Sequence, residues 1–344
     1  MSVHEKYMKR CLELAKKGFG KVAPNPMVGC AIVLDGKIIG EGYHKQFGDA
    51  HAEVNAINSV KNRSLLKDST LYVNLEPCSH FGKNPPCADL IIRYKIKYVV
   101  IGTIDPNPLV AGRGIKKLIS ASCDVSLGIL EDECKELNKR FFIFHDKKRP
   151  YIILKWAETS NKYMGVSGMR YQVSGAKAKK LVHQWRSEEQ SIMAGTNTAL
   201  IDNPQLTVRN IKGKNPLRIV IDKNLKIPSR FNLFDKKVST IIFTEKKKSS
   251  AKNLEYVRIN FKAGILKKIL SKLQKSNIQS LIIEGGAKLL NSFIAENLWD
   301  EARIFMSKKK LSQKDGITAP KISGKVIEQK IIGSDSLKTL RNIS

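Results

Sequence analysis

Long apolar segments are missing from this sequence. No apolar run approaches the roughly 18–20 residues that a helix needs to cross a bilayer, and the N-terminal residues are charged throughout, without the apolar stretch of a secretory signal. Cysteine is also scarce, because 6 Cys in 344 residues cannot form a disulfide framework. We therefore expect a cytoplasmic protein with reduced thiols and no membrane partner.

Acidic residues are few relative to basic ones. The chain has 61 Lys+Arg against 31 Asp+Glu, a formal net charge of +30. This balance is typical of proteins that bind polyanions. Most of the basic residues are Lys spread over the whole length, whereas proteins that read nucleic acids favour Arg. We expect no specific nucleic-acid partner, although a small phosphorylated substrate would benefit from the same positive field.

The length suggests about two domains, and the first half predicts an α/β layered domain. A helix at 4–18 precedes two strands, Val28–Leu34 and Lys37–Tyr43, which Asp35-Gly36 joins as a hairpin. Helices and strands then alternate, with helices at 51–62, 87–94, 114–120 and 131–144 and strands at 71–75, 98–104 and 125–127. Alternation of this kind indicates helices layered on a sheet.

A charged stretch at 145–149 precedes Pro150 and marks the predicted boundary, which gives domains at 1–146 and 147–344. The second half also alternates. Strands are predicted at 151–157, 191–195, 217–222, 239–243, 255–259, 280–284 and 301–307, and helices at 175–186, at 264–275 and from Gly286 to about 296. The pattern predicts a second α/β domain, and the residues after 307 are weakly patterned.

One His and two Cys lie near predicted helix starts. His51 opens one helix, Cys78 follows a strand, and Cys87 opens the next helix. One imidazole and two thiolates suit Zn²⁺. Three protein ligands leave a fourth position for water, whose pKa zinc lowers toward neutrality. Glu53, two residues after His51, is placed to shuttle protons. On the sequence alone, His80 is an alternative ligand.

These residues carry a family resemblance. His51-Ala52-Glu53 together with Pro77-Cys78 resembles the cytidine-deaminase-like superfamily. The string from Glu76 to Cys87, with eight residues between the two Cys, is similar to the deaminase domain of the riboflavin-biosynthesis RibD/RibG family, and so are residues 23–30, 40–44, 105–108 and 112–114. The resemblance covers about residues 1–145 and implies one Zn²⁺ per chain with Glu53 as the catalytic residue. It also implies substrate contacts by Asn25, His44, Lys83, Asp105 and Asn107.

In the second half, a predicted strand leads into Glu284-Gly285-Gly286 and a helix. Such a turn can cradle a phosphate on backbone N–H groups, although glycine pairs also permit close packing. A Gly-x-Gly-x-x-Gly fingerprint does not follow the first strand of this half. Residues 195–209 are polar and rich in turn formers, which is typical of an exposed loop.

Together with residues 149–155 and 182–186, these two segments resemble the reductase domain of the same bifunctional family. That domain has a fold similar to dihydrofolate reductase and uses NADPH. The resemblance implies cofactor contacts from Ala157, Gln172, Thr198, Asp202 and Gly286, and substrate contacts from Arg170, Arg186, Leu206, Arg209 and Glu284. Lys223, at the end of a predicted strand, could neutralise the cofactor's 2′-phosphate. The chain departs from the family pattern at Asn161 and Lys162, where Asp-Gly is frequent, and at Gln172, where Trp is common.

The two resemblances imply a bifunctional enzyme of riboflavin biosynthesis. The first domain would deaminate 2,5-diamino-6-ribosylamino-4(3H)-pyrimidinone 5′-phosphate, and the second would reduce the ribosyl chain to ribityl with NADPH. Two alternatives stay open. A deaminase of tRNA or other nucleic acid is favoured by the charge and opposed by the Cys spacing, and an inactive zinc-stabilised binding module is opposed by the intact Glu53. The sequence is compatible with a homo-oligomer.

Overall fold

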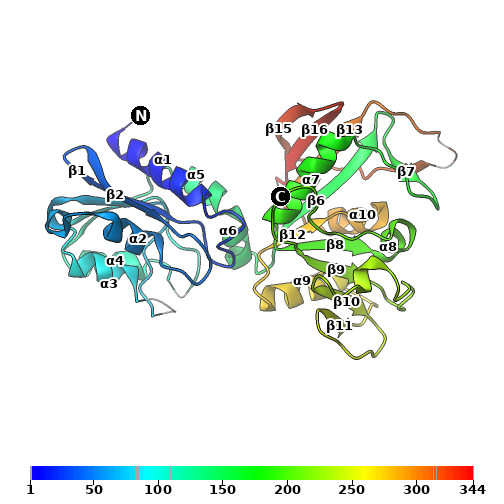
Figure 1. The fold of residues 1–344 in the computed structure, drawn as a ribbon, viewed down its shortest axis with the longest axis horizontal. Helices are drawn as coiled ribbons and strands as arrows, with labels where there is room; N and C mark the ends of the chain where they lie inside the picture. The colour runs from blue at the N-terminus through cyan, green and yellow to red at the C-terminus, as the bar shows by residue number, and fades with distance from the viewer. Residues whose placement is uncertain (1, 82–84, 109, 313, 315, 344) are drawn as a thin grey trace. The chain divides into compact units, whose positions relative to one another are not determined.

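The structure is a computed structural model that describes residues 2–81, 85–108, 110–312, 314 and 316–343. The chain divides into two compact units, Met1–Lys148 (unit 1) and Arg149–Ser344 (unit 2) (Figure 1). Among the described residues, the helices are all too short or too polar to cross a membrane.

Unit 1 is a three-layer α/β/α arrangement around a five-stranded sheet in the order β2-β1-β3-β4-β5. The strands are β1 (Gly29–Leu34), β2 (Lys37–Tyr43), β3 (Thr70–Val73), β4 (Tyr98–Ile101) and β5 (Asp124–Leu127). The helices are α1 (Val3–Lys16), α2 (Ala52–Ser59), α3 (Cys87–Arg93), α4 (Arg113–Ser120), α5 (Glu131–Leu137) and α6 (Lys139–Asp146), with a 3₁₀ turn at Arg63–Asp68. The hairpin β1–β2 is antiparallel, and β3, β4 and β5 are parallel.

Alternating side chains of the strands fill two cores, one on each face of this sheet. Cys30 and Ile32 of β1 pack with α2, α3 and α4. Ala31 and Val33 of the same strand pack with α1 and α5 on the opposite face. Burial on both faces explains why β1, β3 and β4 are largely apolar.

A glycine of β2 sets how closely α2 approaches the sheet. A Cβ atom at Gly42 would overlap the backbone of α2 at Ala52 and Ala56. The helix therefore lies directly against the strand, with no side chain between them. This close contact fixes the start of α2, where His51 is the N-cap residue.

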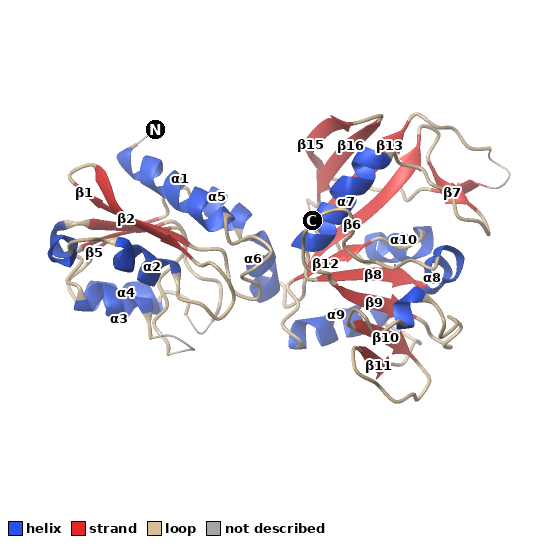
Figure 2. Ribbon diagram, in the orientation of Figure 1, coloured by secondary structure: helices blue, strands red, loops and turns tan. Residues whose placement is uncertain are grey.

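Unit 2 is built on a nine-stranded sheet in the order β11-β10-β9-β8-β12-β6-β13-β16-β15 (Figure 2). The strands are β6 (Tyr151–Thr159), β8 (Ser191–Gly195), β9 (Leu217–Ile221), β10 (Thr240–Thr244), β11 (Leu254–Arg258), β12 (Ser280–Ile283), β13 (Glu301–Ser307), β15 (Lys325–Ile332) and β16 (Asp335–Arg341). From β11 to β13 all neighbours are parallel, and β16 and β15 complete the sheet in antiparallel fashion. The short β7 (Tyr163–Val166) and β14 (Gly316–Thr318) form a separate ribbon.

Helices cover both faces of the unit 2 sheet. Apolar side chains of α9 (Ile265–Lys275) and α10 (Ala287–Ala295) belong to the main core. On α7 (Ala176–Glu188), the Trp185 ring stacks on Phe305 of β13 with centroids 5.4 Å apart. The remaining helical segments are α8 (Thr196–Asp202) and a 3₁₀ turn at Asn232–Phe234. Because the seven parallel strands end at one edge, the loops that follow them meet there.

The α/β class is confirmed in both units, but the structure differs from the sequence-based prediction in several elements, and four strands lie in segments for which no element was predicted. The helix predicted at 131–144 is divided into α5 and α6 at Asn138, whose side chain accepts from the Met27 N–H at 2.8 Å and donates to the Met27 carbonyl at 2.9 Å. Residues 196–202 form α8 rather than an exposed loop. The weakly patterned C-terminal residues form β14, β15 and β16, and β7 was also not predicted.

Candidate active sites

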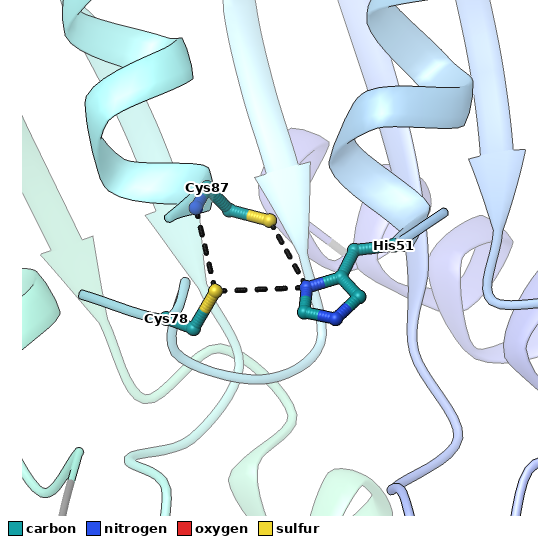
Figure 3. Close-up of side chains that lie close together, drawn as sticks. All are labelled: His51, Cys78 and Cys87. Atoms are coloured by element: carbon teal, nitrogen blue, oxygen red, sulfur yellow. Dashed lines mark hydrogen bonds between the residues drawn. The ribbon is translucent and has the colours of Figure 1, made fainter. Parts of the chain in front are cut away.

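Three side chains meet in unit 1 at the edge where β2, β3 and β4 end (Figure 3). His51 precedes α2, Cys78 follows β3, and Cys87 is the first residue of α3. His51 Nδ1 lies 3.3 Å from Cys87 Sγ and 3.6 Å from Cys78 Sγ. One ligand atom from each residue lies within 4.8 Å of the other two, so the group can close around a single ion. The alternative ligand, His80, is exposed and is not a member of this group.

The two sulfur atoms differ in their electrostatic surroundings. A hydrogen bond from Cys87, aided by His51, lowers the pKa of Cys78 to about 4. The same contact and burial raise the pKa of Cys87 well above its usual value. Hydrogen bonding to Cys78 raises the pKa of His51. A thiolate beside a second thiol and an imidazole is a donor set that Zn²⁺ selects.

Glu53 lies in the first turn of α2 and is 4% exposed. Burial raises the pKa of its carboxyl group, and the negative charge of Cys78 raises it further. A buried carboxyl group with a raised pKa holds a proton more readily than an exposed one and can still release it. It is therefore suited to proton transfer beside a metal ion.

Asn25 and His44 form a directed hydrogen-bonded pair beside the metal-binding group. His44 Nδ1 lies 3.1 Å from the Ala50 carbonyl, and Nε2 lies 3.1 Å from the Asn25 side-chain nitrogen. A carbonyl only accepts, so Nδ1 carries the proton and Nε2 accepts from the Asn25 amide. The His44 ring lies edge-on to His51, with centroids 5.6 Å apart. The Asn25 carbonyl oxygen is therefore turned away from His44.

Asp105 and Asn107 follow β4 at the same edge of the sheet. Asp105 is 8% exposed, and burial raises its pKa to about 7. Its Oδ1 atom accepts the Asn107 N–H at 2.7 Å. The fifth predicted substrate residue, Lys83, lies outside the described residues.

In unit 2, a cleft of about 580 Å³ opens where the parallel strands end. All five residues predicted to contact the reductase substrate line this cleft: Arg170, Arg186, Leu206, Arg209 and Glu284. Three residues predicted to contact the cofactor line it as well: Ala157, Gln172 and Asp202. The fold thus brings residues from β6, α7, α8 and the turn after β12 to one cavity.

The centre of this cleft is strongly charged. Arg186 donates to Glu284 through two parallel hydrogen bonds of 2.9 and 2.8 Å, and Lys155 Nζ lies 3.9 Å from the same carboxylate. Burial alone would raise the pKa of Glu284, but Arg186 and Lys155 outweigh it and lower the pKa to about 2. Burial also lowers the pKa of Lys155, which brings its ammonium closer to the range where it can give up a proton.

α7 also holds the segment that carries Arg209. The Arg209 N–H donates to His183 Nδ1 at 3.1 Å, and the Arg186 guanidinium donates to the Thr207 carbonyl at 3.0 Å. Leu206 is buried and has a φ of +50°, a conformation that branched side chains seldom adopt. This left-handed turn directs the segment back toward the cleft. The guanidinium of Arg209 contacts Gln205 Oε1 at 2.6 Å.

The turn after β12 joins the start of α8. The Gly286 N–H donates to Thr198 Oγ1 at 2.7 Å, and a Cβ atom at Gly286 would lie 3.0 Å from that oxygen. Thr198 and Gly286 therefore adjoin the cleft next to Gly285, which lines it. Lys223 also follows a parallel strand, but it is exposed, and its ammonium lies 3.6 Å from Glu245. Within the described part of the chain, Lys223 is not among the residues that line the cleft.

Sequence reasoning missed three residues of these sites. Lys155 was detectable, since it is a charged residue inside the otherwise apolar start of β6. His183 was quoted as part of a motif, but nothing in the sequence assigned it a partner. Glu76 precedes Pro77-Cys78, and its carboxylate contacts backbone N–H groups more than twenty-five residues away, a separation that no local pattern reveals.

Family models match both units. The cytidine and deoxycytidylate deaminase zinc-binding region matches residues 1–103, and the RibD C-terminal domain matches residues 150–321. The chain is 41% identical to the riboflavin biosynthesis protein RibD of Aquifex aeolicus over 313 residues, which cover 89% of this chain and 87% of the relative. It is 36% identical to the RibD protein of Bacillus amyloliquefaciens over 351 residues, which cover 99% of this chain and 91% of the relative.

Solved structures agree with these matches. The diaminohydroxyphosphoribosylaminopyrimidine deaminase/5-amino-6-(5-phosphoribosylamino)uracil reductase of Thermotoga maritima superposes with a TM-score of 0.89 at 36% identity, covering 99% of both chains. Acinetobacter baumannii RibD superposes with a TM-score of 0.90 at 30% identity, again covering 99% of both chains. The deaminase-like fold of unit 1 and the reductase-like fold of unit 2 are therefore both confirmed.

Proposed function

We propose that unit 1 carries a deaminase site and that unit 2 carries a reductase site. The premise of this proposal is that the chain belongs to the RibD family of riboflavin-biosynthesis proteins. Family membership confirms the sequence-based prediction of a bifunctional deaminase and NADPH-dependent reductase. The assignment of one activity to each part, 1–146 and 147–344, is our proposal. It rests on one observation, that each unit gathers a chemically different set of polar groups at one edge of its sheet.

The donor set of unit 1 fits zinc. His51, Cys78 and Cys87 would hold the ion, which when bound supplies a nucleophilic hydroxide from water near neutral pH. Glu53 would take the proton of the attacking water at its carboxylate and pass it to the ring nitrogen of the pyrimidine. The bond between the ring carbon and its amino group would then break, and the amine would leave as ammonia. The side-chain carbonyl oxygen of Asn25, which is turned away from His44, would accept a hydrogen bond from a donor group of the substrate. Asp105, Asn107 and Lys83 complete the proposed substrate contacts.

The carboxyl edge of the unit 2 sheet fits a dinucleotide. The Gly286 N–H is held by Thr198 Oγ1, and the N–H groups that follow it at the start of α10 suit a phosphate group. Thr198, Gly286, Ala157, Asp202 and Gln172 would hold NADPH, which when bound supplies a hydride. Lys223, at the same edge, would lie beside the 2′-phosphate.

The charged centre of the cleft suits the second substrate. Arg209 and Arg170 provide guanidinium groups for the 5′-phosphate, and Leu206 closes one wall. Reduction of a ribosyl to a ribityl chain consumes one proton together with the hydride. We assign that proton to Lys155, because it lines the cleft and burial lowers the pKa of its ammonium. Glu284, which Arg186 keeps ionised, would orient the Lys155 ammonium and accept hydrogen bonds from hydroxyl groups of the sugar.

The substrates we propose are small phosphorylated pyrimidines: 2,5-diamino-6-ribosylamino-4(3H)-pyrimidinone 5′-phosphate for unit 1 and its deaminated product for unit 2. We further propose a cytoplasmic location, supported by six cysteines that are all free. Binding to nucleic acid would be weak, non-specific and sensitive to salt, since the Lys residues are dispersed. The protein would work alone or as a homo-oligomer.

The direct test is incubation of the purified, zinc-loaded protein with the pyrimidine substrate and NADPH. We expect release of ammonia followed by loss of NADPH absorbance. Omission of NADPH should leave ammonia release intact and let the deaminated, unreduced compound accumulate. NADPH consumption without ammonia release, or neither signal, would contradict the proposed function.

A further inference from the structure

Glu76 precedes the metal-binding Cys78 by two residues and is 4% exposed. Its carboxylate accepts four hydrogen bonds from backbone N–H groups of another part of unit 1. The donors are Asp105 at 3.2 Å and Gly112 at 2.9 Å on Oε2, and Gly114 at 2.9 Å and Ile115 at 3.3 Å on Oε1. A carboxylate has about four acceptor positions, so these donors saturate it.

Three of these donors lie at the start of α4. The N-cap residue of this helix is Gly112, which has no side chain to cap the first turn. The Glu76 carboxylate takes that place, and the positive end of the helix dipole favours its charge. The cost of burying a carboxylate is thereby offset. Glu76 thus caps a helix that begins more than thirty residues after it.

The start of α4 and the segment that carries Cys78 are in close backbone contact. A Cβ atom at Gly114 would overlap the Pro77 carbonyl and lie 3.1 Å from Glu76 Oε1. The start of α4 therefore rests directly on the Pro77-Cys78 backbone. The segment that carries the metal-binding thiol and the start of α4 are packed as one piece.

The same carboxylate also reaches the proposed substrate residues. The Asp105 N–H is one of its four donors, and Asp105 Oδ1 in turn accepts the Asn107 N–H at 2.7 Å. The Glu76 N–H donates to the Thr103 carbonyl at 2.9 Å, two residues before Asp105. A displaced Glu76 would therefore shift Asp105 and Asn107 relative to Cys78.

We propose that Glu76 is a positioning residue of the deaminase site. It ties the segment that carries Cys78 to the segment that carries Asp105 and Asn107, and so sets the distance between the metal and the bound pyrimidine. This role rests on the proposed function of unit 1. Glu76 acts through backbone groups of its neighbours and does not touch the substrate.

The test compares Glu76→Gln with a surface control in zinc-loaded, full-length protein. Gln keeps the volume but turns an NH₂ group toward N–H donors, which leaves them without an acceptor. We expect the deaminase KM to rise about tenfold or more, with zinc content and reductase activity unchanged. Glu13→Gln removes the same charge from a side chain that is 60% exposed and should alter none of these quantities. An unchanged KM in Glu76→Gln would overturn the proposal.

A double-mutant cycle separates positioning from general destabilisation. In an Asn107→Ala background, the effect of Glu76→Gln on KM should become much smaller, because Glu76 would act on the substrate partly through the Asn107 side chain, which this variant lacks. Fully additive effects on KM would mean that Glu76 stabilises the fold without positioning Asn107. If Glu76→Gln does not fold, Glu76→Asp, which keeps the charge but shortens the reach, enters the same cycle.

Amide hydrogen exchange supplies a readout that does not depend on activity. The amides of Gly112, Gly114 and Asp105 should lose protection in Glu76→Gln and keep it in Glu13→Gln. Unchanged protection would overturn the proposal. A wild-type protein that releases no ammonia would contradict the proposed function. The exchange measurement would then still show whether Glu76 holds the start of α4 and Asp105 in place.

Discussion

Arg186 and Glu284, 98 residues apart in the chain, are joined by two parallel hydrogen bonds inside the unit 2 cleft. Their side chains are 12% and 7% exposed, so neither charge is well hydrated. A buried pair of this kind is costly to break, because the remaining charge has no partner. The pair also connects α7 with the turn after β12, and both elements line the proposed reductase site.

Glu284→Gln should therefore destabilise unit 2 by about 3–5 kcal/mol at neutral pH and reduce reductase kcat. The carboxyl pKa is about 2 in the folded protein against 4.5 ordinarily, so its stabilisation is complete above pH 4.5 and is lost as the pH falls toward 2. Urea unfolding at several pH values should show the variant and the wild type converging in acid. Glu255→Gln, which removes one partner of the exposed ion pair with Lys272, should cost less than about 1 kcal/mol. If the difference in unfolding free energy between the variant and the wild type stayed constant across this pH range, the Glu284 carboxylate would not be the source of the stabilisation.

The zinc ligands should be separable from the reductase. We expect about one zinc per chain in wild-type protein and almost none in a Cys78→Ser/Cys87→Ser double variant, because Ser provides no thiolate. Metal analysis and NADPH consumption with the deaminated compound check both parts of the prediction. Full zinc retention by the double variant would rule out this ligand set.

The two activities should be independent. Glu53→Gln keeps the shape of the side chain but cannot accept a proton, so ammonia release should fall by about 10²–10⁴-fold. Zinc content and reduction of the deaminated compound should be nearly unchanged. The converse variant, Arg209→Ala, should lose reduction through weaker phosphate binding and keep ammonia release. If Glu53→Gln also abolished reduction, a single coupled site would have to replace two separate ones.

The reductase should prefer NADPH to NADH. Lys223→Glu should reduce this preference, because it replaces a cation with an anion beside the proposed 2′-phosphate. The measurement is the ratio of kcat/KM for the two cofactors. Lys252→Glu, a charge reversal at another exposed position of unit 2, is the matched control. If the ratio of kcat/KM for NADPH to that for NADH were equal in the wild type and Lys223→Glu, Lys223 would not contact the 2′-phosphate.

The sequence predicted the local parts of the molecule well. His51 and Cys87 open helices and Cys78 follows a strand, so ordinary helix and strand patterns were enough to place them near one sheet edge. The buried strands β1, β8 and β13 also coincide closely with predicted apolar runs. What the sequence did not reveal depends on long-range contacts. Asn138 divides a helix because it binds the backbone at Met27, and β16 alternates polar with apolar residues too weakly to stand out.

Departures from the family pattern are also explained only by the structure. Lys162 stands where the family frequently has Gly, and it adopts a φ of +68°, which is the conformation that favours Gly. Asn161, in place of Asp, accepts from the Thr159 hydroxyl at 2.8 Å and donates to the Leu311 carbonyl at 2.8 Å. Lys162 therefore takes the backbone conformation that Gly favours in the turn between β6 and β7, and Asn161 is held there by two side-chain hydrogen bonds.

The contact between Gly42 and α2 has a consequence for judging distant relatives. A Cβ atom at Gly42 would displace the helix whose N-cap residue is His51, and one at Gly114 would push α4 away from Pro77. A homologue could thus retain every metal-binding residue and still have a distorted centre. A sequence comparison that considers only His51, Cys78 and Cys87 does not detect whether these two glycines are present. In a relative that keeps these three residues, we expect replacement of either glycine to distort the metal-binding group.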